Sequence, residues 1–128
     1  MRHIIFRGKR LDNGEWVYGD LIENQGRYFI YHAMSETTIE DNDDGRIVVA
    51  AVKVDPDTVG QYTGLKDRYG DRIWEGDLVK HGDEVSAVFF DTENSCFDFK
   101  ASNDPFAAQF FCDYEILGNI HDHPDLLK

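Results

Sequence analysis

Cysteine and long apolar runs are scarce in this chain of 128 residues. Two cysteines, Cys96 and Cys112, are too few for the disulfide framework of a small secreted domain. The longest apolar run covers only residues 47–52, which is too short for a helix that crosses a membrane. Residues 1–10 also lack the apolar stretch of a secretory signal. We therefore expect a soluble, cytoplasmic protein with no membrane association.

Basic residues are scarce as well, and the chain is strongly acidic. Lysine and arginine number 13 against 25 acidic residues, which gives a formal net charge of −12. Residues 81–127 hold ten of the acids and a single base, Lys100. A field of this sign repels phosphate backbones, so we do not expect direct nucleic-acid binding by this acidic half. It attracts a basic partner protein, although a role in solubility alone explains the same composition.

Aromatic residues are abundant, with nine Phe, six Tyr and two Trp, and this composition favours strands. Between turn signals, the pattern predicts strands at residues 3–10, 15–22, 27–31, 47–54, 73–80, 85–90, 96–99 and 110–118, and a short strand or arch at 58–65. The polar stretch 33–46 is interpreted as an exposed loop, and helix is limited to single turns near 102–109 and 123–127. The sequence therefore predicts a mainly β fold with little helix. Its antiparallel strands form a small barrel or sandwich with one or more SH3-like elements.

Two segments of the chain resemble each other. Residues 12–22 and 68–79 both contain a turn glycine, a tryptophan and then Gly-Asp-Leu followed by an aliphatic residue. The shared pattern is typical of a repeated unit in which a strand bends at a glycine. We predict one domain over residues 1–128, and the alternative is two β subunits of about 1–54 and 55–128.

Five blocks of sequence, taken in order, form a pattern that covers nearly the whole chain. They are Phe6–Arg10, Gly14–Leu21, VDPDTVGQYTGLKD at 54–67, IWEGDLV at 73–79 and Glu115–Ile120. In these blocks the chain resembles the YopX family. The resemblance implies a small, largely β protein that is encoded by a bacteriophage or prophage and acts in the cytoplasm of a bacterial host cell. The biochemical role of the family is uncharacterised, and the family has no recognised catalytic residues to carry over.

The strongest candidate for metal binding is His121-Asp122-His123-Pro124-Asp125. Two imidazoles spaced two residues apart can reach one ion, and Asp125 would complete three ligands. The alternative is a surface turn with Pro124 at the first helical position. The thiols of Cys96 and Cys112 lie beside aromatic residues, as buried structural cysteines do. Without a nucleophile or phosphate-binding motif, we expect neither enzyme activity nor a cofactor.

The aromatic residues Trp16, Tyr18, Tyr62 and Trp74 are predicted to pack in the core or at an interface. The same prediction covers Phe89, Phe97, Phe111 and Ile116. The alternative is contact with nucleic acid. In that case the basic side chains nearest to Tyr62 in sequence would contact the phosphate backbone of the nucleic acid, namely Lys53, Lys66, Arg68 and Arg72.

Three functional hypotheses follow. The first is a phage or prophage accessory protein, homo-oligomeric, whose acidic C-terminal half contacts a basic host or phage protein. The second is a nucleic-acid-associated SH3-like barrel. The third is a metal-binding protein that uses His121 and His123.

Overall fold

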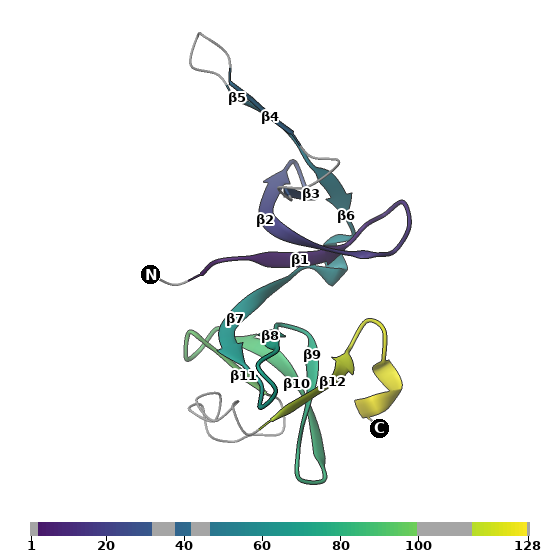
Figure 1. The fold of residues 1–128 in the computed structure, drawn as a ribbon, viewed down its shortest axis with the longest axis vertical. Helices are drawn as coiled ribbons and strands as arrows, with labels where there is room; N and C mark the ends of the chain where they lie inside the picture. Colours follow the sequence, from purple (N-terminus) through teal and green to yellow (C-terminus); the bar gives the residue numbers. More distant parts are fainter. Residues whose placement is uncertain (1–2, 32–37, 42–46, 100–113, 128) are drawn as a thin grey trace. The chain divides into compact units, whose positions relative to one another are not determined.

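The computed structural model describes residues 3–31, 38–41, 47–99 and 114–127. The chain divides into two compact units. The N-terminal unit consists of residues 4–61, and the C-terminal unit consists of residues 62–128 together with 1–3. In the described part of the chain, regular structure consists of antiparallel strands and two short 3-10 turns (Figure 1). The prediction of a mainly β, antiparallel fold with little helix is confirmed.

The N-terminal unit is one curved sheet and one two-stranded hairpin. The sheet has the strand order β6-β3-β2-β1-β7. Its strands are β1 (Phe6–Lys9), β2 (Trp16–Asn24), β3 (Arg27–Tyr31), β6 (Val52–Val54) and the start of β7 (Gly60–Lys66). The 3-10 turn η1 (Pro56–Thr58) leads from β6 into β7, and β4 (Thr38–Asp41) pairs with β5 (Ile47–Ala50) in the hairpin.

The curved sheet closes on itself between β6 and the end of β1. Arg10 and Val54 form an antiparallel bridge. The N–H of Asp55 donates to the carbonyl of Lys9 at 2.8 Å, and the N–H of Leu11 donates to the carbonyl of Lys53 at 3.2 Å. These contacts make the sheet a small barrel. The SH3-like detail stays a prediction.

Local sequence explains the tight turns and close approaches of this barrel. Gln25 and Gly26 both have positive φ, 52° and 77°, as the two central residues of a tight β-hairpin turn require. Gly19 lies so close to the backbone carbonyl of Tyr31 that a Cβ there would overlap it. The core beneath the sheet contains Ile30 and Val54, both fully buried.

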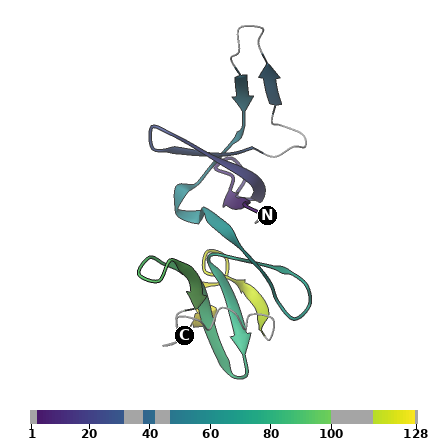
Figure 2. The ribbon, with the colours of Figure 1, turned by 90° about the vertical axis from the view of Figure 1, so that its left-hand side faces the viewer.

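The C-terminal unit contains a four-stranded sheet and the hairpin of β7 with β8 (Arg72–Trp74). The four-stranded sheet has the order β11-β10-β9-β12. Its strands are β9 (Asp77–His81), β10 (Glu84–Asp91), β11 (Cys96–Phe99) and β12 (Glu115–Asn119). Figures 1 and 2 show β12 in yellow, followed by the closing 3-10 turn η3 (Pro124–Leu127).

The core of the C-terminal unit is built from side chains of four strands. It contains Ile73, Val79, Val88 and Phe99, with Tyr114 and Ile116 packed against them. The buried Asp77 carboxylate accepts the N–H of Trp74 at 2.7 Å, which holds the turn between β8 and β9. The predicted strand at 73–80 is therefore two strands separated by a turn.

The structure also corrects two strand predictions in the N-terminal unit. The apolar run 47–54 is not one strand, because it divides at Ala51 into β5 and β6, which pair with different neighbours. The stretch 33–46 is not wholly a loop, because β4 begins at Thr38. The predicted turn at 123–127 is present as η3. The predicted turn at 102–109 lies outside the described residues.

The two similar segments of sequence adopt different structures. The first, around Gly19, is one continuous strand, β2. The second bends at Gly76, where φ is 92°, and divides into β8 and β9. Along the chain, the boundary between the two compact units falls between Gln61 and Tyr62. The two-subunit alternative from the sequence divides the chain near residue 54.

Candidate functional site

The hairpin of β10 and β11, residues 84–99, carries the most exposed pair of aromatic residues on the strands of the C-terminal unit; we call it the acidic hairpin. Val88 and Phe99 lie opposite each other and point into the core. Phe89 and Phe90 are 39% and 43% exposed. The ring of Phe90 lies edge-on to that of Phe97, with centroids 5.1 Å apart. Aromatic area at the end of this hairpin is thus available to a partner.

The tip of the acidic hairpin is ordered around Asp91. Its carboxylate accepts the side-chain N–H of Asn94 at 2.8 Å and the backbone N–H groups of Glu93 and Asn94 at 2.9 and 3.3 Å. The Asn94 hydrogen bond, helped by these backbone donors, lowers the pKa of Asp91. The carboxylate therefore stays charged at neutral pH, beside the exposed Glu93.

The β11 strand of this hairpin carries two other polar groups, Asp98 and Cys96. Asp98 is buried, and its carboxylate accepts the N–H of Phe99 at 2.8 Å. Burial, and then the charges of Asp91 and Asp98, raise the pKa of the Cys96 thiol. Cys96 is thus a poor nucleophile at neutral pH, since the thiolate is the reactive form. Cys112 and Phe111 lie outside the described residues.

The predicted aromatic residues divide between core and surface. Tyr62 and Trp74 are each 7% exposed, with ring centroids 5.6 Å apart. Trp16 is half-buried, and the Arg7 guanidinium lies 4.6 Å from its ring centroid. Tyr18 is exposed. The cation–π contact of Trp16 could not be found from sequence, because it depends on the pairing of β1 with β2.

The predicted basic residues belong to two different compact units. Lys66, Arg68 and Arg72 share the β7–β8 hairpin and are all exposed. Lys53 belongs to β6 in the N-terminal unit. The sequence prediction missed Tyr69, which is 67% exposed within the same hairpin. Its position between Arg68 and Gly70 was the available signal, because residues of connecting turns lie on the surface.

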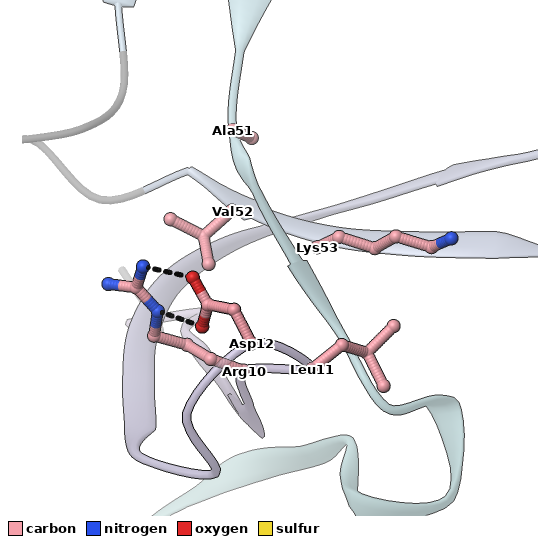
Figure 3. A pocket seen from close by; sticks show the side chains of 6 residues that line it. All are labelled: Arg10, Leu11, Asp12, Ala51, Val52 and Lys53. Atoms are coloured by element: carbon pink, nitrogen blue, oxygen red, sulfur yellow. Dashed lines mark hydrogen bonds and ion pairs between the residues drawn. The ribbon is translucent and has the colours of Figure 1, made fainter.

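A pocket of about 510 Å³ lies in the N-terminal unit, between the segment after β1 and the start of β6 (Figure 3). It is lined by Arg10, Leu11, Asp12, Ala51, Val52 and Lys53. The Arg10 guanidinium donates two hydrogen bonds to Asp12, at 2.9 and 2.7 Å, and this contact lowers the pKa of Asp12. No sequence motif marks this pocket, because its walls come from segments about forty residues apart.

The candidate metal ligands form a surface turn organised by Asn119. The side-chain oxygen of Asn119 accepts the N–H groups of His121 and Asp122 at 3.0 and 2.9 Å. The Nδ1 atom of His123 accepts the N–H of Asn119 at 3.3 Å, so this nitrogen is already engaged. Among the residues that the structure describes, no three His, Cys, Asp or Glu side chains gather as a metal site. The candidate set of His121, His123 and Asp125 is not assembled here.

In the described residues, no helix is long and apolar enough to cross a membrane.

Comparisons with known proteins place the chain in a family. A search of curated proteins finds no match. The fold is similar to that in the crystal structure of protein EF1440 from Enterococcus faecalis, with a TM-score of 0.69, 18% identity and full coverage of both chains. The family model described as YopX protein matches residues 5–128. The chain therefore belongs to the YopX protein family.

Proposed function

We propose that this protein is a phage or prophage accessory protein that acts by binding another protein. In this proposal the acidic hairpin is the contact surface, and the partner is a basic protein of the host or the phage. The observation that carries the proposal is the exposure of Phe89 and Phe90 beside the charged tip formed by Asp91 and Glu93. No catalytic residue and no cofactor is assigned, and the place of action is the cytoplasm of the host cell.

The aromatic pair supports binding through the hydrophobic effect. Burial of apolar surface contributes about 25 cal/mol per Å², and aromatic side chains supply much of the area in protein interfaces. Phe89 and Phe90 are neighbours on one strand, so their side chains point to opposite faces of the hairpin. A partner that grips the hairpin end from both sides would cover both rings.

The acidic residues support the choice of partner. Asp91 is held in its charged form by Asn94, and Glu93 is exposed at the same tip. Charges at the rim of an interface mainly raise the association rate and exclude partners of the same sign. The sign of this tip therefore favours a basic surface, such as the nucleic-acid-binding face of another protein.

The test is capture of partners from host lysate by three tagged proteins of known mass in solution. They are the natural chain, Glu93→Lys at the hairpin tip, and Glu23→Lys, which makes the same charge change at an exposed site of the N-terminal unit. We expect the natural chain to capture a basic protein in a fixed molar ratio. The capture should persist after nuclease treatment, and high salt should release the captured protein. Its recovery should fall several-fold with Glu93→Lys and stay unchanged with Glu23→Lys.

A second pair of variants tests the aromatic part of the proposal. Phe90→Ser should reduce affinity for the captured protein by about 2 kcal/mol, as truncation of a central interface aromatic does. Phe90→Tyr keeps the ring and should bind normally. Thermal unfolding of each variant shows whether the fold is intact.

Two outcomes of the capture experiment would contradict the proposal. One is an equal loss of captured protein with Glu23→Lys and Glu93→Lys, and the other is capture that disappears after nuclease treatment.

Self-association is part of the same proposal. The first ten residues have a formal charge of +4, and the acidic half has the opposite sign, so copies of the chain can attract one another. Light scattering after gel filtration should give a mass above 14.7 kDa that falls as salt rises. A monomer at every salt concentration would remove this part of the proposal.

A further inference from the structure

We propose that the hairpin between β7 and β8, residues 66–72, binds the phosphate backbone of a single-stranded nucleic acid and stacks one base on Tyr69. We call this segment the basic hairpin. It lies in the C-terminal unit but is separate in sequence from the acidic hairpin. The inference is independent of the proposed protein contact.

The basic hairpin is held in one shape by a buried carboxylate. Asp67 is 5% exposed, and one of its oxygens accepts the N–H groups of Tyr69 and Asp71, both at 2.9 Å. Its other oxygen accepts the N–H of Ile116 on β12 at 3.2 Å. The N–H of Arg68 donates to the carbonyl of Tyr114 at 3.0 Å. The loop is therefore anchored to β12 before any ligand arrives, which lowers the entropy cost of binding.

Three positive side chains surround this anchored loop. Lys66 and Arg72 lie directly opposite each other in the β7–β8 pairing, and Arg68 follows two residues after Lys66. Like charges placed directly opposite on paired strands destabilise a hairpin. A phosphate group between them would convert this repulsion into attraction. The Arg72 guanidinium lies 5.2 Å from the ring centroid of Tyr62, which helps to fix its position.

Tyr69 supplies the second element of a single-strand site. It is 67% exposed at the turn, where Gly70 has a φ of 84°. Its backbone N–H is held by Asp67, while its ring remains accessible. Proteins that bind single strands combine such an aromatic platform with a cationic track, because every base can stack on a ring.

The negative net charge of the chain does not exclude this site. At physiological salt, charges on the surface are screened beyond about 8 Å. Within the hairpin, the Asp67 carboxylate is buried and accepts hydrogen bonds from backbone N–H groups. Asp71 is therefore the exposed acidic residue of the hairpin, beside three exposed basic side chains. Within the hairpin itself, the exposed positive side chains therefore outnumber the exposed acids.

The experiment measures fluorescence anisotropy of a labelled, mixed-sequence DNA oligonucleotide of about 16 nucleotides, near the upper site size of a single-strand-binding OB fold. We expect binding at about 50 mM salt. The logarithm of the binding constant should fall with the logarithm of the salt concentration at a slope of about −2, because three phosphate contacts contribute about −0.7 each. Arg72→Gln and Lys66→Gln should each reduce the slope by about 0.7. Tyr69→Ser should weaken binding roughly fivefold or more, and Tyr69→Phe should not.

Lys53→Gln is the matched control, because it removes one positive charge from the N-terminal unit. It should leave both affinity and slope unchanged. The proposal is overturned if no binding occurs at low salt, or if Lys53→Gln acts like Lys66→Gln. It is also overturned if Tyr69→Ser has no effect, or if polyglutamate competes as well as the oligonucleotide, since that would indicate an acidic protein as the ligand.

Discussion

Removal of the buried carboxylate at Asp67 should destabilise the C-terminal unit strongly. Asp67→Ala leaves three backbone N–H groups without their acceptor, those of Tyr69, Asp71 and Ile116. A hydrogen bond to a charged group contributes about 1.5–3 kcal/mol. Tyr69 and Asp71 lie at the exposed turn, where water replaces much of the loss, whereas Ile116 is half-buried. We therefore expect the free energy of unfolding to fall by about 3 kcal/mol.

The two tryptophans allow this prediction to be tested in one unit at a time. Trp74 is buried in the C-terminal unit, and Trp16 belongs to the N-terminal unit. Urea unfolding of Asp67→Ala in a Trp16→Phe background, followed by the fluorescence of Trp74, reports on the C-terminal unit. The same variant in a Trp74→Phe background reports on the N-terminal unit, where we expect a smaller change.

A conservative variant distinguishes charge from hydrogen bonding. Asp67→Asn keeps one oxygen acceptor but removes the charge, so it should cost about half as much as Asp67→Ala, or about 1.5 kcal/mol. A change below about 0.5 kcal/mol for Asp67→Ala, within the range of ordinary surface substitutions, would refute the reasoning. It would mean that the loop orders itself without its buried acceptor.

Three further predictions concern close packing and titration. Gly19→Ala should lower the unfolding free energy of the N-terminal unit by about 2 kcal/mol or more in urea titrations, because its Cβ would overlap the carbonyl of Tyr31. Because Arg10 lowers the pKa of Asp12, that pair should stabilise the fold above the unfolded pKa of the carboxyl and lose this effect as pH falls through the folded value. Arg10→Gln should raise the pKa of Asp12 measured by NMR, and high salt should weaken the difference. Because the pKa of Cys96 is raised, its alkylation at pH 7, followed by mass spectrometry, should be slower in the folded protein than in urea, and its contribution to stability should decline as pH rises through the unfolded pKa.

Local patterns predict much of the fold because strand formation depends on near neighbours. The alternation around Trp16 and Tyr18 and the Gln25-Gly26 turn are enough to place the β2–β3 hairpin. The prediction for 47–54 is wrong because an apolar run does not say which strand it pairs with. That run contributes to two separate ladders, and a break at Ala51 has no sequence signal as plain as glycine or proline.

The candidate surfaces depend on pairing that no short pattern contains. Lys66 and Arg72 become neighbours only when β7 pairs with β8, and Lys53 belongs to the other compact unit. The sequence predicts Phe89 and Phe97 either in the core or at an interface, because apolar residues of strands occur in both places. The packing of Val88 and Phe99 under the sheet decided which face is covered.

By itself, the sequence determined the class of fold, the family and the sign of the charge. Turn chemistry, β-branched and aromatic runs and net charge are properties of single residues and their near neighbours, and they survive without knowledge of contacts. Tertiary structure alone decided that Asp67 is an internal acceptor while Lys66, Arg68 and Arg72 face solvent, although all four belong to one polar stretch. The physical reason is that the N–H of Ile116, forty-nine residues away, needs an acceptor, and only the folded chain brings the two together.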